Sequence, residues 1–183
     1  WFHPAIVAGA GLGLRQAEVS GLTVDRVDWL RRTVRVDRQW RTKGPRDEWG
    51  FAPTKTAAST RTIPAAAAVL TEMGRHTGEV FVVELPTGGP ADHNRFNAAW
   101  RATCKTAGIE GMRFHSLRHH FASALISAGC SVKAVQHALG HTSATTTLTT
   151  YSHLWPGDED RIRAAVEVAF SPAEDSVRTD GAG

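Results

Sequence analysis

The sequence has few cysteines and no long hydrophobic run. Cys104 and Cys130 are the two cysteines in 183 residues, which is too few for a disulfide scaffold, and they lack metal-ligand spacing. No apolar run approaches the roughly 18 residues that span a membrane, and no basic stretch precedes an apolar one as in a signal peptide. We therefore expect a reducing, cytoplasmic setting. The first residue is Trp1 rather than Met, which indicates a part excised from a longer protein.

Acidic residues are scarce over most of the chain. Residues 1–157 carry 11 Asp and Glu against 18 Lys and Arg, a net charge of +7, whereas residues 158–183 carry 7 against 3, a net charge of −4. A basic body suits a polyanion such as DNA, whose phosphates dominate affinity. A basic surface that is merely solvated explains the same charges. Arginine supplies 17 of the 21 cations, and its planar guanidinium favours two-pronged contacts to phosphate.

Hydrophobic periodicity predicts one domain that is mainly α with a small three-stranded antiparallel β-sheet, an α+β fold. Residues 3–20 read as a helix broken near Gly9–Gly13. We expect strands at Thr33–Trp40, Glu48–Pro53 and Thr60–Ile63, with a turn around Thr56–Ser59. Pro64 is expected to open an alanine-rich helix, since proline is favoured at the first helical position. A further helix is predicted near residues 93–107.

The C-terminal half reads as a series of capped helices. Ser116 is predicted to cap a helix whose apolar stripe is Leu117, Phe121, Ala124, Leu125 and Ala128. Ser131 is expected to cap a second helix that ends at Gly140, and a third begins near Thr142–Ser143 and runs toward Tyr151. Residues 158–170 read as an amphipathic helix with Ile162, Ala165, Val166, Ala169 and Phe170 on its apolar face, and residues 171–183 as a disordered tail.

Two short segments contain residues suited to phosphate chemistry. His115 precedes the helix that Ser116 would cap and Arg118 lies in its first turn, where free N–H groups and the helix dipole attract an anion. An arginine adds a bidentate grip and a histidine can move a proton. Tyr151, the one tyrosine of the chain, follows His141 by ten residues. A phenol has a pKa of about 10 and needs a base or nearby cations to act as a nucleophile.

Together these segments resemble the tyrosine recombinases of the phage-integrase family. The matching stretches are Gly13-Leu14-Arg15-Gln16-Ala17-Glu18, Thr54 to Pro64 around Lys55, His115-Ser116-Leu117-Arg118-His119-His120-Phe121-Ala122-Ser123, Leu139-Gly140-His141-Thr142-Ser143 and Tyr151-Ser152-His153. The resemblance covers residues 3 to 170. It implies the catalytic-domain fold of that family over residues 1–170, and an activity that breaks and rejoins DNA strands.

The resemblance also implies a role for each matched residue. Tyr151 would attack a backbone phosphate to give a 3′-phosphotyrosine link, without metal, cofactor or ATP. Arg15 and Arg118 would hold the two non-bridging oxygens, and His141 would add a hydrogen bond to the same group. Lys55 would protonate the departing 5′ oxygen, and His115 would handle the tyrosine proton or a phosphate oxygen. Glu18 would support Arg15 or His115.

The same resemblance implies partners and an origin. The partner would be double-stranded DNA, with a tetramer forming on DNA in the full-length protein, and the source bacterial or phage. An N-terminal DNA-gripping domain would precede this one. The helix at 158–170 would dock in a neighbouring protomer, and packing on its own domain is the open alternative.

Three alternatives remain open. Histidines at 115, 119 and 120, or at 137 and 141, could form a metal site, although carboxylate or cysteine partners at useful spacing are missing. The helices from Ser116 to Thr150 could form a helix-turn-helix DNA-binding module without catalysis. A type IB topoisomerase uses similar residues to relax supercoils, but the compact length and short hairpin favour the recombinase.

Overall fold

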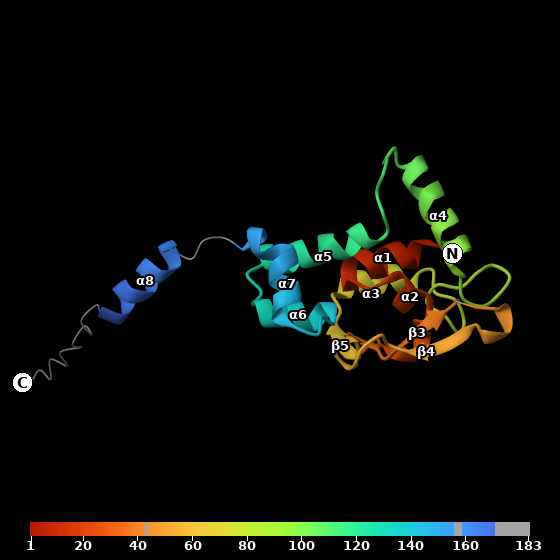
Figure 1. The fold of residues 1–183 in the computed structure, drawn as a ribbon, viewed down its shortest axis with the longest axis horizontal. Helices are drawn as coiled ribbons and strands as arrows, with labels where there is room; N and C mark the ends of the chain where they lie inside the picture. The colour runs from red at the N-terminus through yellow and green to blue at the C-terminus, as the bar shows by residue number, and fades with distance from the viewer. Residues whose placement is uncertain (43, 156–158, 171–183) are drawn as a thin grey trace, which may run out of the picture.

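Helix α1 lies at the centre of the body, with α2, α3 and α5 packed against it (Figure 1). The computed structural model describes residues 1–42, 44–155 and 159–170. The helices are α1 His3–Leu12, α2 Gln16–Ser20, α3 Ala67–Gly74, α4 His93–Thr106, α5 His115–Ser127, α6 Val132–Leu139, α7 Ala144–Tyr151 and α8 Glu159–Phe170. Four short 3-10 segments are η1 Val24–Arg26, η2 Arg46–Glu48, η3 Ala57–Ser59 and η4 Ser152–Leu154. The mainly helical fold class with a small antiparallel sheet is confirmed.

Five short strands form two antiparallel sheets rather than one. They are β1 Val27–Asp28, β2 Thr33–Val36, β3 Arg38–Arg41, β4 Gly50–Pro53 and β5 Arg61–Pro64. One sheet has the order β1-β2-β5, and the other is the β3-β4 hairpin. The prediction of one strand over Thr33–Trp40 was wrong, because Asp37 accepts hydrogen bonds from Arg26 at 3.1 Å and the chain changes sheet there. The two-residue strand β1 was not predicted.

Pro64 ends a strand rather than opening a helix. It pairs with Thr33 at the end of β5, and α3 begins three residues later at Ala67. A proline is tolerated there because a strand end does not need its missing N–H. The helix expected near 93–107 is α4, which starts after Asp92, whose carboxylate accepts from the backbone N–H groups of Asn94 and Arg95. Its buried side chains are Phe96, Trp100 and Cys104.

Helices α5 to α7 include the segments that were predicted to take part in phosphate chemistry. Helix α5 begins at His115, so Ser116 lies inside its first turn and is not the cap. Its buried stripe is Leu117, Phe121, Ala122 and Ile126, and Ala124 is exposed, which corrects the predicted stripe. The predicted cap at Ser131 is confirmed, since it accepts from Ala134 N, and the next helix begins near Ser143 as predicted, where Ser143 accepts from Thr146 N.

Helix α8 stands apart from the body in Figure 1. Its apolar side chains are largely exposed, with Phe170 at 84% and Ile162 at 60%. The helix itself was predicted, but the described side chains of its apolar face do not pack into the core. Residues 156–158 and the tail expected at 171–183 lie outside the described residues. Among the helices described, none combines the length and the apolar character needed to cross a membrane.

Candidate active site

The carboxyl end of α6 holds three arginines from three other parts of the chain. Its last carbonyls lack partners within the helix and form the negative end of the helix dipole. Arg61 Nε donates to the carbonyl of Ala138 at 2.8 Å, Arg118 Nη2 to that of Leu139, and Arg15 Nη2 to that of Gly140 at 3.5 Å. We call Arg15, Arg61 and Arg118 the arginine cluster. Three consecutive carbonyls therefore bring together guanidinium groups from the N-cap of α2, from β5 and from α5.

Two glycines make this convergence possible. Gly140 ends α6 with φ +64°, and a Cβ there would lie 2.9 Å from Arg61 Nη1. Gly13 ends α1 with φ +62°, its carbonyl accepts from Arg118 Nη1 at 2.6 Å, and a Cβ on it would overlap the ring of Phe121. A side chain at either position would combine an unfavourable backbone conformation with a steric clash. The turn at Gly13 therefore leads the chain from the end of α1 to Arg15, a member of the arginine cluster.

Glu18 is the carboxylate that binds the arginine cluster. It is 4% exposed and accepts from Arg15 N and Nη1 at 2.9 and 2.8 Å, and from both terminal nitrogens of Arg61 at 3.2 and 3.1 Å. Burial alone would raise the pKa of Glu18, but the hydrogen bonds and charge of Arg61, with those of Arg15, outweigh it and lower that pKa. The predicted support of Arg15 by Glu18 matches this geometry, and no hydrogen bond joins Glu18 to His115 among the described residues.

Arg61 is a site residue that the sequence motifs did not single out. It lies in the matching stretch from Thr54 to Pro64 without a predicted role, yet its side chain is fully buried. A signal was present, because side chains alternate along a strand and Arg61 shares the inward face of β5 with the buried Ile63. An arginine at an inward position needs a buried acceptor, and Glu18 together with Ala138 provides it.

Arg118 is the most deeply buried of the predicted phosphate-binding residues, at 2% exposed. Burial, followed by the charge of Arg15, lowers the pKa of Arg118 to about 9, so it remains a cation at neutral pH. The cluster has three cations against the single carboxylate of Glu18. Its net charge is therefore +2, and Arg118 keeps three of its five N–H donors beyond the two used on Gly13 and Leu139. Such a cluster favours binding of an anion.

His141 follows the three acceptor carbonyls directly. Its Nδ1 lies 2.9 Å from Oγ1 of Thr147, which is fully buried on α7. Burial and then the charges of Arg118, Arg15 and Arg61 lower the pKa of His141 to about 4, so the ring is neutral at pH 7. If the Thr147 hydroxyl donates to Nδ1, the proton of the neutral ring is on Nε2. His141 is then a hydrogen-bond donor that adds no charge.

Tyr151 ends α7 and is 4% exposed. Its hydroxyl lies 2.7 Å from Nδ1 of His119, on α5. Burial raises the pKa of Tyr151, and the charge of Arg118 partly opposes that rise. Arg118 is thus near enough to act electrostatically on the tyrosine, although the hydroxyl's hydrogen-bond partner is His119. His119 occurs within a quoted motif but was not assigned a role in the predicted site.

His115 and Lys55 lie at the edge of this arrangement. His115 is exposed at the start of α5, and partial burial with the charges of His119, Arg118 and Arg15 lowers its pKa. Lys55 is exposed in the turn between β4 and η3, and no hydrogen bond is found for it within the described residues. The segment after Lys55 does reach the site, since Ser59 Oγ lies 3.5 Å from the carbonyl of Gly140. No group of three or more potential metal ligands occurs among the residues that the structure describes.

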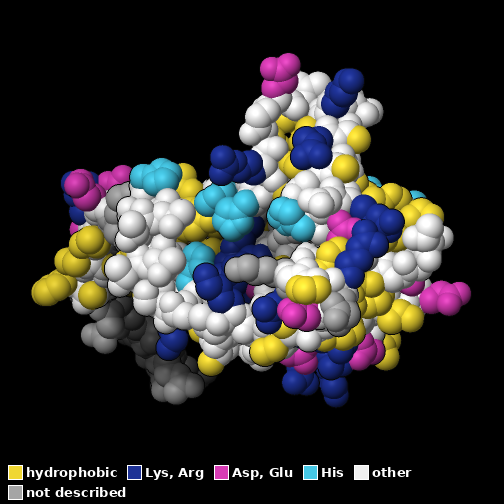
Figure 2. Space-filling view, turned by 45° about the vertical axis from the view of Figure 1, so that its right-hand side comes forward, with side chains coloured by type: hydrophobic (Ala, Val, Ile, Leu, Met, Phe, Trp, Pro, Cys, Tyr) yellow, Lys and Arg dark blue, Asp and Glu magenta, His cyan; other side chains and the backbone are white. Residues whose placement is uncertain are grey.

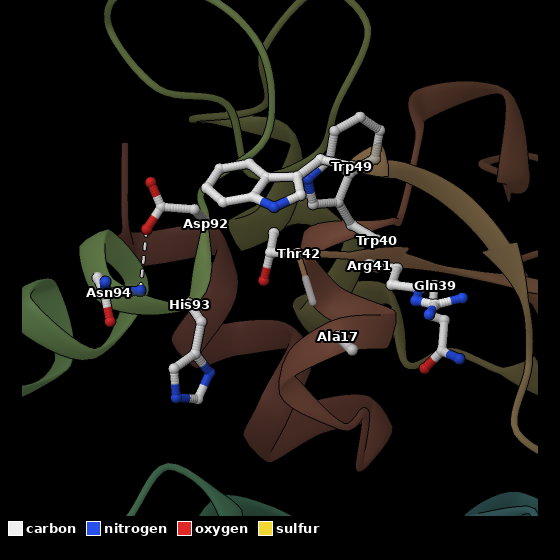
Figure 3. A pocket seen from close by; sticks show the side chains of 9 residues that line it. All are labelled: Ala17, Gln39, Trp40, Arg41, Thr42, Trp49, Asp92, His93 and Asn94. Carbon is white, nitrogen blue, oxygen red and sulfur yellow. Dashed lines mark hydrogen bonds between the residues drawn. The ribbon is translucent and has the colours of Figure 1, made fainter. Parts of the chain in front are cut away.

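A row of three pockets runs past Arg15, and we call it the groove. The first, of about 570 Å³, is drawn in Figure 3, with the indoles of Trp40 and Trp49 on one side and His93 on the other. The second shares Ala17 and His93 with it and includes Arg15, and the third shares Gln16 and ends at His115. The charged residues lining the groove are Arg15, Arg41, Arg101, Arg113 and Asp92. Figure 2 shows histidines around a group of Lys and Arg side chains on one hollowed face.

The arginine cluster, the neighbouring neutral His141 and a tyrosine on which the charge of Arg118 acts form a site suited to phosphoryl transfer to tyrosine. The model of the phage integrase family matches residues 9–156. The chain belongs to this family, and it forms a tyrosine-recombinase catalytic domain.

Relatives with curated functions agree with this assignment. The chain is 27% identical over 173 residues to a tyrosine recombinase XerC-like protein of Caldanaerobacter subterraneus, covering 80% of this chain and 44% of the relative. It is 31% identical over 146 residues to the tyrosine recombinase XerD of Corynebacterium glutamicum, covering 79% and 45%. The chain therefore spans less than half the length of these relatives.

Solved structures share the fold. The Tn1549 transposon integrase in complex with circular intermediate DNA matches with a TM-score of 0.73 and 25% identity, covering 92% of this chain and 59% of that one. The catalytic domain of bacteriophage HP1 integrase matches with a TM-score of 0.56 and 18% identity, covering 94% and 83%, and shows likeness of fold.

Proposed function

We propose that this domain breaks and rejoins double-stranded DNA through a covalent bond between Tyr151 and a 3′ phosphate. The observation that carries the proposal is the anchoring of three arginines on three consecutive carbonyls at the end of α6, next to His141. Phosphoryl transfer asks mainly for positioning and for stabilisation of charge on the transferred group. A preorganised cationic site provides both without reorganising during the reaction.

Each predicted site residue has a task in this reaction. Arg15 and Arg118 hold the non-bridging oxygens, and the neutral His141 donates a further hydrogen bond to them. Glu18 and Arg61 orient Arg15 and the end of α6. Tyr151 attacks phosphorus, the bond to the 5′ oxygen breaks, and Lys55 protonates that oxygen; His115 serves a phosphate oxygen or the tyrosine proton. The bond energy remains in the phosphotyrosine, so a 5′ hydroxyl can reverse the step without ATP.

The groove supports a DNA partner. Of its five charged lining residues, four are arginines, and the one carboxylate, Asp92, is used in capping α4. Arginines along a groove bind phosphates with strong salt dependence. The Tn1549 integrase was solved with DNA, and we place a duplex along the groove here. Because chromosomal and phage DNA are cytoplasmic in bacteria, we propose that the protein acts in the cytoplasm.

A nicked duplex carrying the end sequence of the element that encodes the protein tests this function. A nick near the cleavage site lets the 5′-terminal piece diffuse away and traps the covalent complex. We expect a protein–DNA band that survives denaturation with the wild-type domain. A second duplex with a free 5′ hydroxyl should then be joined to the trapped strand, whereas relaxation of a supercoiled plasmid without such joining would favour a topoisomerase. Absence of any covalent band would refute the proposal.

We further propose that α8 docks on a neighbouring protomer of a tetramer assembled on DNA. The exposed side chains of its apolar face support this, with Val166 at 50% exposed in addition to Phe170 and Ile162. An apolar helix face of this kind is stabilised by burial against a partner. Sedimentation on bound DNA with and without residues 158–183 tests it. Unchanged assembly after truncation would count against docking.

A further inference from the structure

Among the described residues, one side chain forms a hydrogen bond with the hydroxyl of Tyr151, and it is His119. The Nδ1···Oη distance is 2.7 Å, typical of a good hydrogen bond. The two rings also touch, with centroids 5.6 Å apart at 59°. His119 lies one residue after Arg118 on α5, so one helical turn presents the phosphate-binding arginine and the partner of the tyrosine.

His115 is placed differently. It lies one turn earlier on α5, and its ring packs edge-on against that of His119 with centroids 4.9 Å apart. No hydrogen bond joins His115 to Tyr151 among the described residues. The charges of His119, Arg118 and Arg15 all act on His115, so His115 lies near the arginines as well as near His119. Of the two histidines, His119 is the one within reach of the tyrosine proton.

The tyrosine needs such a partner. A phenol that is buried gives little phenolate near neutral pH, so attack on phosphorus requires a base within hydrogen-bonding distance. Imidazole is suited to that task because it gains and loses a proton near neutral pH. The ring of His119 is exposed, so a proton taken from Tyr151 can pass to water from the other nitrogen.

We propose that His119 is the catalytic base for Tyr151, an inference that rests on the proposed function of the site. As the tyrosine oxygen forms its bond to phosphorus, its proton moves to Nδ1 of His119, and the bond from phosphorus to the 5′ oxygen breaks. The electron pair leaves with that oxygen, which Lys55 protonates. In rejoining, the 5′ hydroxyl attacks phosphorus and its proton returns to Lys55, the bond from phosphorus to Tyr151 breaks, and His119 returns its proton to the tyrosine oxygen. His115 is then left to bind a phosphate oxygen.

Other titratable or charged groups occur on the elements around His119, and the test must separate them. They are His115, Arg118 and His120 on α5, Tyr151 on α7, His153 on η4, and Lys133 and His137 on α6. His120 provides a matched control, because it is an exposed histidine on the same helix for which no hydrogen bond is found among the described residues. A loss of function that occurs in His119→Ala but not in His120→Ala therefore cannot be a general effect of removing a histidine from this helix.

The contact can be tested in the free domain. Tyr151 is the one tyrosine, so a carbon label at the phenol Cζ gives a single NMR signal. We expect His119→Ala to shift this signal, and Tyr151→Phe to shift the ring signals of His119, because each change removes the hydrogen bond between the two side chains. His120→Ala should shift neither. Unchanged signals in the first two variants would overturn the proposal.

The chemical role is tested by the rate of covalent attachment to the nicked duplex as a function of pH, with DNA binding measured on the same samples. His119→Ala should bind DNA normally and attach about 10²-fold more slowly, and its rate should no longer rise as imidazole loses its proton. His119→Gln should be equally slow, because an amide can accept the hydrogen bond but not the proton. His120→Ala should match wild type.

Two kinetic results would overturn the role of His119. Recovery of the rate by His119→Gln would mean that the residue only orients the tyrosine. A normal or faster rate in His119→Ala would mean that the contact is unused or holds Tyr151 back. No attachment by the wild-type domain refutes the proposed function itself, which is a different outcome from a wild-type rate in the variant.

Discussion

Glu18 accepts hydrogen bonds from both terminal nitrogens of Arg61, at 3.2 and 3.1 Å, and neither side chain is more than 3% exposed. A buried pair of this kind is costly to break from one side, by about 3–5 kcal/mol, because the remaining charge is left without a partner. The same carboxylate binds Arg15. Glu18 therefore contributes both to the stability of the fold and to the geometry of the arginine cluster.

Glu18→Gln should therefore weaken both stability and attachment to DNA. Glutamine keeps the shape and one acceptor oxygen, so we expect the free energy of unfolding to fall by about 3 kcal/mol, at the lower end for a broken buried pair. Denaturant unfolding measures this. Stability unchanged from wild type would mean that water, rather than Glu18, satisfies Arg61.

The pH dependence of this difference has a definite sign. The pKa of Glu18 is lowered in the folded protein, so its contribution is complete above the pKa of an unfolded glutamate, about 4.3. It is lost as the pH falls through the folded value. The difference in unfolding free energy between wild type and Glu18→Gln should therefore shrink in acid. A gap that is constant from neutral pH to strongly acidic pH would contradict the assignment.

Arg118→Lys should slow attachment by at least about a hundredfold, on the scale of losing one transition-state donor. Arg118 reaches the carbonyls of Gly13 and Leu139 with two different nitrogens. A lysine keeps the charge but cannot span both carbonyls and a phosphate with one ammonium group. Single-turnover attachment to the nicked duplex is the measurement. A near-normal rate would mean that Arg118 acts as a point charge or has a structural role.

Thr147→Val tests how His141 is held. The change removes the hydroxyl 2.9 Å from Nδ1 of His141 and keeps nearly the same shape at a fully buried position. We expect attachment to slow by about tenfold, because His141 loses the partner that fixes its tautomer. Serine at the same position restores the hydroxyl and should recover part of the rate. Equal loss in Thr147→Ser and Thr147→Val would indicate a packing effect instead.

His141 also makes a prediction about acid. Its pKa of about 4 lies below that of an unfolded histidine, near 6.5. Between these values the unfolded chain binds more protons than the folded one, so His141 lowers stability as the pH falls from about 6.5 toward 4. NMR titration of the ring in the folded domain measures the pKa directly. A His141 that titrates near 6.5 would show that the surrounding arginines do not act on it.

The sequence could predict the helices with strong caps and the motif residues, but not the links between them. The N-cap at Ser131 and the start of the next helix near Ser143 depend on local contacts and were predicted correctly. The change of sheet at Asp37 depends on Arg26, eleven residues away, and no local pattern reveals it. A proline such as Pro64 can either open a helix or end a strand. Here it ends a strand, because it pairs with Thr33.

The site follows the same division. Arg15, His115, Arg118, His141 and Tyr151 stand in motifs, and each could be named from the sequence. The role of Arg61 depends on its position opposite Glu18, 43 residues away, and that of His119 depends on the approach of α7 to α5. Both lie within quoted segments, yet only the packing of helices and strands shows which atoms they contact.

Tyr151→Phe should abolish the covalent complex while leaving DNA binding nearly unchanged. The hydroxyl makes one hydrogen bond in the described structure, to His119, so the cost to folding should be about 1 kcal/mol. Denaturing gels and thermal unfolding measure the two effects. A covalent band that persists in the phenylalanine variant would refute Tyr151 as the nucleophile.

Lys55→Ala isolates the proposed general acid. An alkoxide is a poor leaving group, so the 5′ oxygen needs a proton as it departs, and loss of the acid should slow attachment to ordinary DNA by about 10²–10⁴-fold. A thiolate is a far better leaving group, since thiols have pKa values near 8.5. A duplex with sulfur at the bridging 5′ position should therefore restore most of the rate of Lys55→Ala.

The competing explanation is that Lys55 only grips DNA. Its side chain is exposed, as a gripping lysine would be, but Arg61 faces the core and cannot share that task. A gripping lysine would leave Lys55→Ala equally slow on both duplexes, with weaker binding and a shallower dependence on salt. Arg118→Ala is the control, because removing a phosphate clamp should slow both substrates alike. If sulfur rescues Lys55→Ala but not Arg118→Ala, the lysine supplies the proton; if it rescues neither, the assignment of Lys55 as the acid is wrong.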